Sequence, residues 1–399
     1  MRSPHRVVIA GGGIAGLEAL LALRALGAGR VELTLVSAEE DFVYRPMAVA
    51  RPFGLGHARH TPLADAARDA GATLKIAALE SVDRDARMIR TSDGDLGYDE
   101  LVLAVGARSE RAFARGTSWD DRADDEAMSG LLRDLEEGYL PSLAIVVPPG
   151  PGWPLPAYEL ALMIRRDAYG MGMDPKITIV TPEQAPLAVF GARAVEAITT
   201  ELDAAGIALE TGAYAELAPG DLTTVRLRPG DRSFDVARVL ALPRLHGRPI
   251  PGVPHDGDGF VEVDEHCRVR GIDGVWAAGD GIAFPIKFGG LATQQADAAA
   301  EDIAHLAGAV AEPRPFRPVL RGRLLTGGAQ RWMRYAAAGG GGEGQTATHA
   351  LWWPPGKVAG RYLAPWLAAR DDATVAGHLP EHEGVSVQID LNRSFTVTR

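Results

Sequence analysis

Residues 6–26 read RVVIAGGGIAGLEALLALRAL, and this stretch decides the fold. The apolar run 6–10 predicts a short buried strand, residues 17–26 predict a helix, and residues 31–36 predict a second strand. Three glycines between the first strand and the helix have the spacing G-x-G-x-x-G: Gly11, Gly13 and Gly16. Such glycines let the backbone approach a pyrophosphate, and the N-terminus of the helix favours its negative charge. The sequence therefore predicts a dinucleotide-binding unit here.

Length and composition limit what the rest of the chain can be. The 399 residues fit about two domains. With 46% hydrophobic and 23% charged residues, the composition is that of a globular protein and excludes general disorder. A net charge of -11 argues against a nucleic-acid partner, because affinity for phosphate needs Lys and Arg. The single cysteine, Cys267, excludes an intrachain disulfide and a cysteine-based metal cluster.

The sequence predicts a cytoplasmic protein without a targeting segment. The longest uncharged run, residues 138–158, contains six prolines and cannot be a membrane-spanning helix. No metal site is expected either, because His57 and His60 have no third ligand nearby.

Two later segments distinguish FAD from NAD as the expected dinucleotide. YDELVLAVGA (98–107) predicts a strand that ends in Ala-Val-Gly, and VWAAGD (275–280) predicts one that ends in Gly-Asp. FAD is long, so its flavin end needs support from strands that are distant in the sequence. An acid after a terminal strand, here Asp280, can hold the ribityl or phosphate end. With the first motif, these segments are typical of flavoproteins that have two dinucleotide-binding domains.

The residue that binds the ribose is expected about 20 residues past the glycine motif, where many such proteins have an acid. Ser37 occupies that place, and Glu39 follows it closely. Either side chain is a candidate for the ribose hydroxyls. For Glu39, a solvated loop acid stays open as the alternative.

Five segments make the chain resemble the FAD-dependent pyridine nucleotide-disulfide oxidoreductase superfamily. Within it, the chain is similar to sulfide:quinone oxidoreductases, flavocytochrome c sulfide dehydrogenases and type II NADH dehydrogenases, and the serine at the ribose position is also seen in the sulfide:quinone branch. The segments span nearly the whole chain: LTLVSAEEDFVYRP (33–46), PAYELA (156–161), VDEHCRV (263–269), VWAAGD (275–280) and GKVAGRYL (356–363).

This resemblance implies an α/β fold with two Rossmann-like dinucleotide-binding domains and a C-terminal extension. Residues 1–114 and 247–313 would form the FAD domain, residues 115–246 the second Rossmann-like unit, and residues 314–399 a cover over the flavin. The motifs and the resemblance together give these candidate FAD-binding residues: Gly11, Gly12, Gly13, Ala15, Gly16, Ser37, Ala38, Glu39, Arg45, Pro46, Ala77, Gly106, Gly279, Asp280 and Lys287.

The chain departs from the sulfide-oxidising relatives at their redox cysteines. Those relatives use a pair of cysteines that flank the flavin, and the position that matches one of them is Trp153. Cys267 lies instead in VDEHCRV, where we expect an ordinary small residue at the periphery of the sheet. The resemblance therefore implies a fold and a flavin, but not sulfide oxidation through a cysteine pair.

A second glycine motif is incomplete. In PPGPGWPLPAYELA (148–161), Gly150 and Gly152 keep the first spacing, but Leu155 stands in the place of the third glycine. Three prolines, which lack the backbone N–H groups that cradle a phosphate, lie in the same turn: Pro151, Pro154 and Pro156. This turn is a poor pyrophosphate site. Because Glu183 follows the next strand, where a ribose acid would lie, NAD(P)H stays open as a substrate.

Two side chains are candidates for catalysis at the flavin. Glu159 lies early in a helix that begins near Pro156, and the resemblance places it where it would relay a proton; a plain first-turn acid is the alternative. Residues 293–306 predict another helix, capped by Thr293, whose N-terminus would stabilise negative charge at the pyrimidine end of the flavin. Lys287, just before it, would add a positive charge, with a surface lysine as the alternative.

The C-terminal segment has a different composition. Residues 314–370 contain nine Lys or Arg and one acid, Glu343. Four tryptophans lie there: Trp332, Trp352, Trp353 and Trp366. Two roles stay open: peripheral contact with an anionic membrane surface, or a cover over the open face of the flavin with solvated arginines. A glycine-rich loop at residues 339–344 and a final strand at residues 385–397 are also predicted.

The sequence thus predicts an FAD-dependent oxidoreductase that passes electrons from a small-molecule donor to a quinone-like acceptor without redox cysteines. An NAD(P)H:acceptor oxidoreductase is the first alternative. A flavin-bound interaction or scaffold protein without turnover is the second. A homodimer is an expected form of either enzyme.

Overall fold

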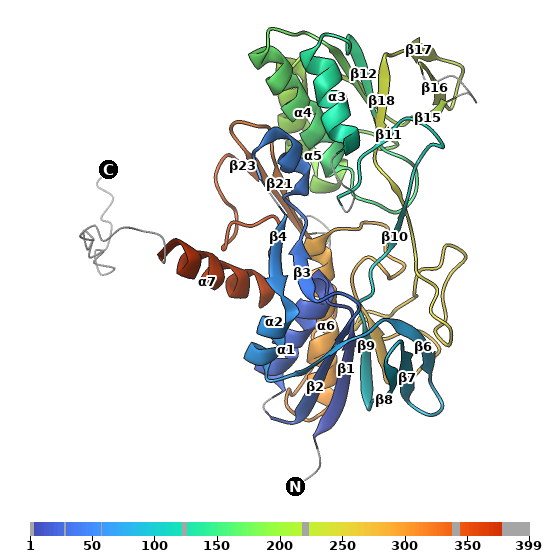
Figure 1. Cartoon of the computed structure of the whole chain (residues 1–399), viewed down its shortest axis with the longest axis vertical. Helices are drawn as coiled ribbons and strands as arrows, with labels where there is room; N and C mark the ends of the chain where they lie inside the picture. Colours follow the sequence, from blue (N-terminus) through green and yellow to red (C-terminus); the bar gives the residue numbers. More distant parts are fainter. Residues whose placement is uncertain are drawn as a thin grey trace, which may run out of the picture.

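The computed structural model describes residues 4–27, 29–56, 58–121, 126–217, 223–336 and 344–376. Two parallel sheets organise the elongated molecule, one near each end (Figure 1). Both sheets are covered by helices, as parallel sheets require. The α/β class and the parallel Rossmann-like sheets that the sequence predicts are confirmed.

The first sheet contains the N-terminal strand and is assembled from distant parts of the chain. Its order is β20 (Val275–Ala277), β9 (Glu100–Leu103), β1 (His5–Ala10), β2 (Val31–Ser37) and β5 (Thr73–Ile76). Its helices are α1 (Ile14–Leu26), α2 (Leu63–Ala70) and α6 (Gly289–Leu306). The four strands that the sequence predicts in this sheet form: residues 6–10 and 31–36, and shorter strands within 98–107 and 275–280. Helix α1 begins at Ile14, three residues before the predicted start, and its first turn includes Gly16, the last glycine of the motif.

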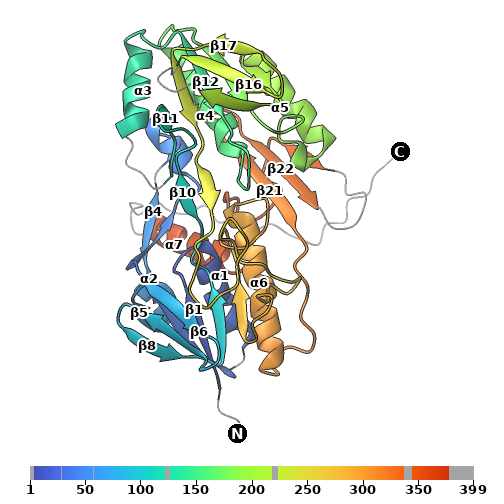
Figure 2. The ribbon, with the colours of Figure 1, turned by 90° about the vertical axis from the view of Figure 1, so that its right-hand side faces the viewer.

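The second sheet lies at the other end of the molecule. Its order is β11 (Thr117–Ser118), β18 (Arg238–Ala241), β12 (Ser142–Val146), β13 (Lys176–Val180) and β14 (Ala208–Glu210). Its helices are α3 (Glu126–Glu136), α4 (Leu155–Gly170) and α5 (Ala192–Ala204). The pair β10 (Arg108–Glu110) and β19 (Arg244–His246) joins the two ends (Figure 2). The domain limits at residues 114, 246 and 313 stay a prediction.

Short elements surround the two sheets. They are β3 (Asp41–Tyr44), η1 (Ala48–Phe53), β4 (Arg59–Pro62), β6 (Leu79–Asp83), β7 (Met88–Thr91), β8 (Gly94–Gly97), η2 (Ala188–Phe190), β15 (Tyr214–Leu217), β16 (Thr224–Arg228) and β17 (Ser233–Asp235).

The C-terminal segment forms a small antiparallel sheet and a helix. They are β21 (Val319–Leu324), β22 (Arg331–Ala336), β23 (Gln345–Ala347) and α7 (Leu363–Ala376). Helix α7 lies beside α1 and α2 (Figure 1). The predicted strand 385–397 and all but Gly344 of the predicted loop lie outside the described residues. No helix in the described ranges is long and apolar enough to cross a membrane.

The basic residues of this segment do not form a freely solvated surface. Several arginines pair with acids of other elements: Arg314 and Arg361 with Glu301, Arg331 with Glu201, and Arg370 with Asp69. Their positive charges are therefore partly neutralised, which weakens the electrostatic case for an anionic membrane. Trp332 is buried, whereas Trp353 is 85% exposed. Contact with a membrane stays a prediction that rests on Trp353.

Candidate functional site

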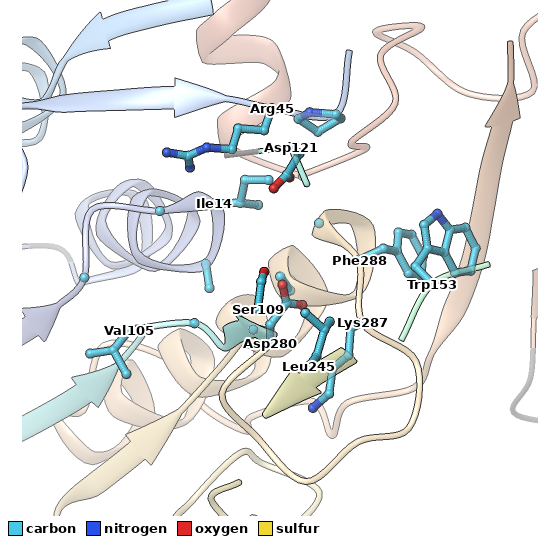
Figure 3. Close-up of a pocket in the computed structure, with 18 of the residues that line it drawn as sticks. Ile14, Arg45, Val105, Ser109, Asp121, Trp153, Leu245, Asp280, Lys287 and Phe288 are labelled. Carbon is cyan, nitrogen blue, oxygen red and sulfur yellow. The ribbon is translucent and has the colours of Figure 1, made fainter. Parts of the chain in front are cut away.

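A cavity of about 1030 Å³ runs from the first glycine turn to the second sheet. It lies beyond the carboxyl ends of the strands of both sheets, which is where ligands bind in open α/β folds. Its volume is at the upper limit for small-molecule pockets, so it has room for an extended ligand. Figure 3 shows Trp153 and Phe288 together at one side, and Asp280 and Lys287 on a neighbouring wall.

The first glycine turn has the geometry of a pyrophosphate seat. A Cβ atom on Gly11, at φ +126°, would lie 2.2 Å from the Ala104 carbonyl oxygen, so only glycine fits there. A Cβ on Gly16 would lie 1.8 Å from the Gly11 oxygen, which holds the helix close to the turn. A Cβ atom on Gly13 would meet no described atom within 4 Å, so this face of Gly13 is open to the cavity. It is the N-cap of α1 and makes no side-chain cap, leaving first-turn N–H groups available to an anion.

Every predicted FAD-binding residue except Gly16 lines this cavity. The Ser37 hydroxyl is buried and accepts a hydrogen bond from the Glu39 amide at 3.1 Å. The Glu39 side chain is exposed at the rim. The structure therefore brings the predicted residues together around one space, and their contacts with a cofactor stay a prediction.

Gln295 belongs to this site and was not found from the sequence. Its buried side-chain oxygen accepts a hydrogen bond from the Gly279 amide at 2.8 Å. This contact fixes the turn after β20 on helix α6. Because Gln295 lies inside an alanine-rich helix, nothing in its local pattern marks it.

Lys287 is buried, so the alternative of a surface lysine is wrong. Its ammonium group donates to the Ile282 carbonyl and lies 3.9 Å from the centre of the Phe260 ring. Burial lowers the pKa of Lys287 to about 8, although Asp280 opposes the shift. A charge on Lys287 therefore lies close to the cavity wall and titrates near neutral pH.

Thr293 is not the cap of the helix that follows, and this prediction was wrong. Helix α6 begins at Gly289 with Phe288 at the N-cap position. Thr293 lies in the second turn, where its hydroxyl donates to the Gly290 carbonyl at 3.1 Å. Gly289 and Gly290 form the first turn of this helix, and a Cβ atom on either would collide with Val358 or Phe288.

The second glycine turn is tied to the segment before α6. The Gly152 amide donates to the Pro285 carbonyl at 3.0 Å, and the Lys287 amide donates to the Gly152 carbonyl at 3.1 Å. Trp153 stacks on Phe288, with ring centres 4.3 Å apart. One of the few N–H groups left between the prolines is thus already used. The turn therefore presents aromatic rings to the cavity, whereas a complete glycine motif would present backbone N–H groups to a phosphate.

Glu183, the candidate ribose acid of the second unit, is already hydrogen-bonded to other residues of the protein. One of its oxygens accepts hydrogen bonds from the Tyr158 hydroxyl at 2.7 Å and the Thr181 hydroxyl at 3.0 Å. Burial raises the pKa of Glu183, and the two hydroxyls oppose this shift. The carboxyl group lines the cavity but is held by the protein itself.

Glu159 and Lys357 form a buried ion pair on the cavity wall. Glu159 is fully buried one turn into α4, and it accepts hydrogen bonds from Lys357 at 2.7 Å and from the Leu325 amide at 2.9 Å. Burial raises the pKa of Glu159 and lowers the pKa of Lys357, while each charge stabilises the other. A plain first-turn acid does not describe Glu159, and Lys357 is a site residue that sequence reasoning missed.

Cys267 lies away from the cavity. It is buried in the hydrophobic core to which α1 and α6 contribute, and burial strongly raises the pKa of its thiol. A thiol in this state is a poor nucleophile, because the thiolate is the reactive form. Since the chain has no other cysteine, no thiol lines the cavity.

Comparison with known proteins agrees with this geometry. Residues 5–302 match the pyridine nucleotide-disulphide oxidoreductase family. The chain belongs to this family. It is accordingly a flavin-dependent oxidoreductase, as the sequence predicts.

Curated relatives have about the same length as the chain. An NADH dehydrogenase-like protein of Mycobacterium tuberculosis is 30% identical over 298 residues, which cover 69% of this chain and 72% of the relative. The ferredoxin–NAD(+) reductase component of the biphenyl dioxygenase system of Paraburkholderia xenovorans is 28% identical over 314 residues, covering 71% and 69%.

Solved structures share the fold at lower identity. The sulfide:quinone oxidoreductase of Aquifex aeolicus has a TM-score of 0.75 at 19% identity, over 93% of this chain and 91% of the other. Putidaredoxin reductase in its covalent complex with putidaredoxin has a TM-score of 0.60 at 21% identity, over 85% and 83%.

Proposed function

We propose that the protein binds FAD in the long cavity and passes electrons from a small-molecule donor to a quinone-like acceptor without a thiol. The observation that carries this proposal is the continuity of the cavity. It runs from the open Gly13 face to the stacked rings of Trp153 and Phe288, and it contains no cysteine. Bound FAD would supply the two-electron chemistry that the side chains lack.

Side chains at the two ends of the cavity have different tasks. The amides at the start of α1 hold the pyrophosphate, and Ser37 and Glu39 lie at the ribose. Lys287 and the N-terminus of α6 supply positive potential at the reacting end. Glu159 holds or releases a proton there, with Lys357 fixing its position and charge.

The flat apolar wall supports a quinone-like acceptor. Trp153 and Phe288 lie nearly parallel, with an interplanar angle of 16°, and Phe190 packs edge-on against Trp153 at 5.7 Å. Aromatic rings of this kind favour a flat apolar ligand by offset stacking.

A second candidate function is NAD(P)H oxidation at the same cavity. The relatives whose names contain NADH or NAD(+) support it. Gly150 and Gly152 also line the cavity, and a Cβ atom on either would meet no described atom within 4 Å. Two observations oppose this function. The Gly152 amide already donates to the Pro285 carbonyl, and the Glu183 carboxylate already accepts hydrogen bonds from two hydroxyl groups.

An anaerobic reduction titration tests both candidates. The purified protein is expected to be yellow, and its flavin absorbance is followed while donors are added one at a time, followed by a soluble quinone. Bleaching by a small non-nicotinamide donor and recovery with quinone supports the first candidate. Rapid bleaching by NADH or NADPH favours the second.

The Cys267→Ala variant is the control for the absence of thiol chemistry. It is expected to reduce and reoxidise at the wild-type rate, because the thiol lies outside the cavity. Loss of turnover with flavin still bound would contradict the proposal. A colourless protein that takes up no added FAD would overturn both candidates.

A further inference from the structure

One face of strand β21 presents two arginines to the cavity. Side chains alternate along a strand, and Leu320 and Leu324 are buried on the inner face. Arg321 and Arg323 lie on the opposite face, and both line the cavity. Two arginine side chains thus leave the same face of the strand, and both line the cavity, as Lys357 does.

Among the described residues, the hydrogen bonds of the Arg323 guanidinium go to neutral groups. It donates to the Gln330 side-chain oxygen at 2.7 Å and to the Pro355 carbonyl at 2.9 Å. Its guanidinium carbon lies 5.0 Å from the centre of the Trp332 ring. These contacts fix the side chain but leave its charge uncompensated by a hydrogen-bonded carboxylate.

Arg321 makes fewer hydrogen bonds than Arg323. Within the ranges that the structure describes, its guanidinium makes no hydrogen bond and no ion pair. The residue directly opposite on β22 is Arg334, a like charge. Burial and Arg334 both lower the pKa of Arg321, so its surroundings oppose its charge. A guanidinium group stays protonated at ordinary pH, so Arg321 does not become neutral in these surroundings.

The cavity wall at this end has an excess of positive charge. Arg321, Arg323 and Lys357 line it, and the carboxylate among their contacts is Glu159, which is already paired with Lys357. Arg321 and Arg323 are half-buried. Removing a charge partly from water without a partner has a cost, and an anion in the cavity would lower that cost. The planar fork of an arginine matches a carboxylate with two parallel hydrogen bonds.

We propose that Arg321, with Arg323 beside it, binds the carboxylate of a small organic acid that is a substrate at this cavity. The aromatic rings of Trp153 and Phe288 in the same cavity favour an organic body over an inorganic ion. Calling this acid a substrate rests on the proposed function. The binding itself does not depend on it.

Matched probes test the charge requirement without any turnover. Benzoate and benzamide have the same ring and nearly the same shape, and differ in charge. Binding is measured by calorimetry and by quenching of tryptophan fluorescence at constant ionic strength, with sulfate as the inorganic probe. We expect benzoate to bind about tenfold more tightly than benzamide and than sulfate. Equal binding of benzoate and benzamide would overturn the proposal. Sulfate that binds as tightly as benzoate would overturn the assignment to an organic acid.

A pair of variants locates the binding group. Arg321→Gln is expected to lower the affinity for benzoate about tenfold and to leave benzamide binding unchanged. Arg334→Gln is the matched control, because it removes the same charge from the opposite strand but from a side chain that is exposed and outside the cavity. We expect it to change benzoate binding less than about threefold. Equal effects of both variants, or equal loss of benzoate and benzamide, would contradict the proposal.

Failure of this inference can be told apart from failure of the proposed function. Flavin content is measured on each preparation from its absorbance. Flavin with no preference for benzoate refutes the carboxylate site alone. Preference for benzoate in a protein that never binds FAD supports the site and refutes the proposed function.

Discussion

The two helices that follow the two turns bury a glutamate at the same place. Glu18 is the fifth residue of α1, and Glu159 is the fifth residue of α4; neither side chain is exposed. Glu18 accepts the amides of Tyr362 and Leu363 at 2.8 and 2.7 Å, at the start of α7. Glu159 binds Lys357 and the Leu325 amide. Each glutamate thus ties part of the C-terminal segment to its own unit.

The two charges are balanced in different ways. Glu159 has a cation, and both partners line the cavity. Glu18 has a second acid beside it, Asp297, and burial together with Glu18 raises the pKa of Asp297 to about 9. Asp297 is therefore protonated at neutral pH and shares its proton with Glu18. The same position supports a contact away from the cavity in one unit and an ion pair on the cavity wall in the other.

The two glycine turns also differ in whether their backbone amides are available to a ligand. A Cβ atom on Gly13 or on Gly152 would meet open space. The amides that follow Gly13 face the cavity, whereas the Gly152 amide is bonded to the Pro285 carbonyl. Equal topology therefore does not make equal ligand sites, because the backbone N–H groups decide what a turn can hold.

The largest effect is expected from breaking the ion pair. Glu159→Gln leaves the Lys357 ammonium buried without a counter-charge, so we expect the free energy of unfolding to fall by about 3 kcal/mol. Glu18→Gln removes one hydrogen bond to a backbone amide and is expected to cost about 1 kcal/mol. Denaturant unfolding of both variants measures the difference. Equal losses would show that the two glutamates are equivalent.

A pH dependence distinguishes the acid pair. Because the folded-state pKa of Asp297 lies above its unfolded value, its contribution to stability is complete in acid and is lost as pH rises toward about 9. In the Asp297→Asn variant, the side-chain amide would donate a hydrogen bond to Glu18 at every pH, because an amide does not titrate. Between pH 6 and pH 8 we expect wild type to lose about 2 kcal/mol more of its free energy of unfolding than the variant. Parallel stability curves would refute the shared proton.

Alanine at the two open glycines compares the turns directly. Gly13→Ala adds a methyl group at the pyrophosphate seat and should weaken FAD binding about tenfold, or about 1.4 kcal/mol. Gly152→Ala should leave FAD bound. Flavin release is followed by fluorescence. If NADH is a substrate, Gly152→Ala instead raises the NADH concentration needed for half-maximal reduction. Retention of FAD at wild-type affinity in Gly13→Ala would refute the seat.

The last prediction concerns Lys287, whose amide donates to the carbonyl oxygen of Gly152 in the second turn. Lys287→Met removes a positive charge from the cavity wall, so the midpoint potential of the bound flavin should fall by about 30 mV, equivalent to about 1.4 kcal/mol for two electrons. Since the pKa of Lys287 is about 8, the difference should shrink above that pH. Lys176→Met, at an exposed lysine of β13, is the control and should leave the potential unchanged. A constant difference across that pH range would contradict the assignment.

Local patterns were sufficient for the first turn and for the predicted strands that lie within the described residues. They failed at Thr293, because helix α6 begins earlier, at Gly289. They gave no sign of Lys357 as a partner of Glu159, since the two residues are 198 positions apart. Arg321 lay in a segment interpreted as a cover or a membrane contact, and only the strand register shows that it meets Arg334.

The sequence by itself determined the first dinucleotide turn and the lack of a redox cysteine pair, because glycine spacing and residue counts are local and need no folding to be observed. Only the tertiary structure decided which charges are buried, which are paired, and which amides stay available. Those properties depend on distant segments meeting in a low-dielectric interior, where a missing partner is costly.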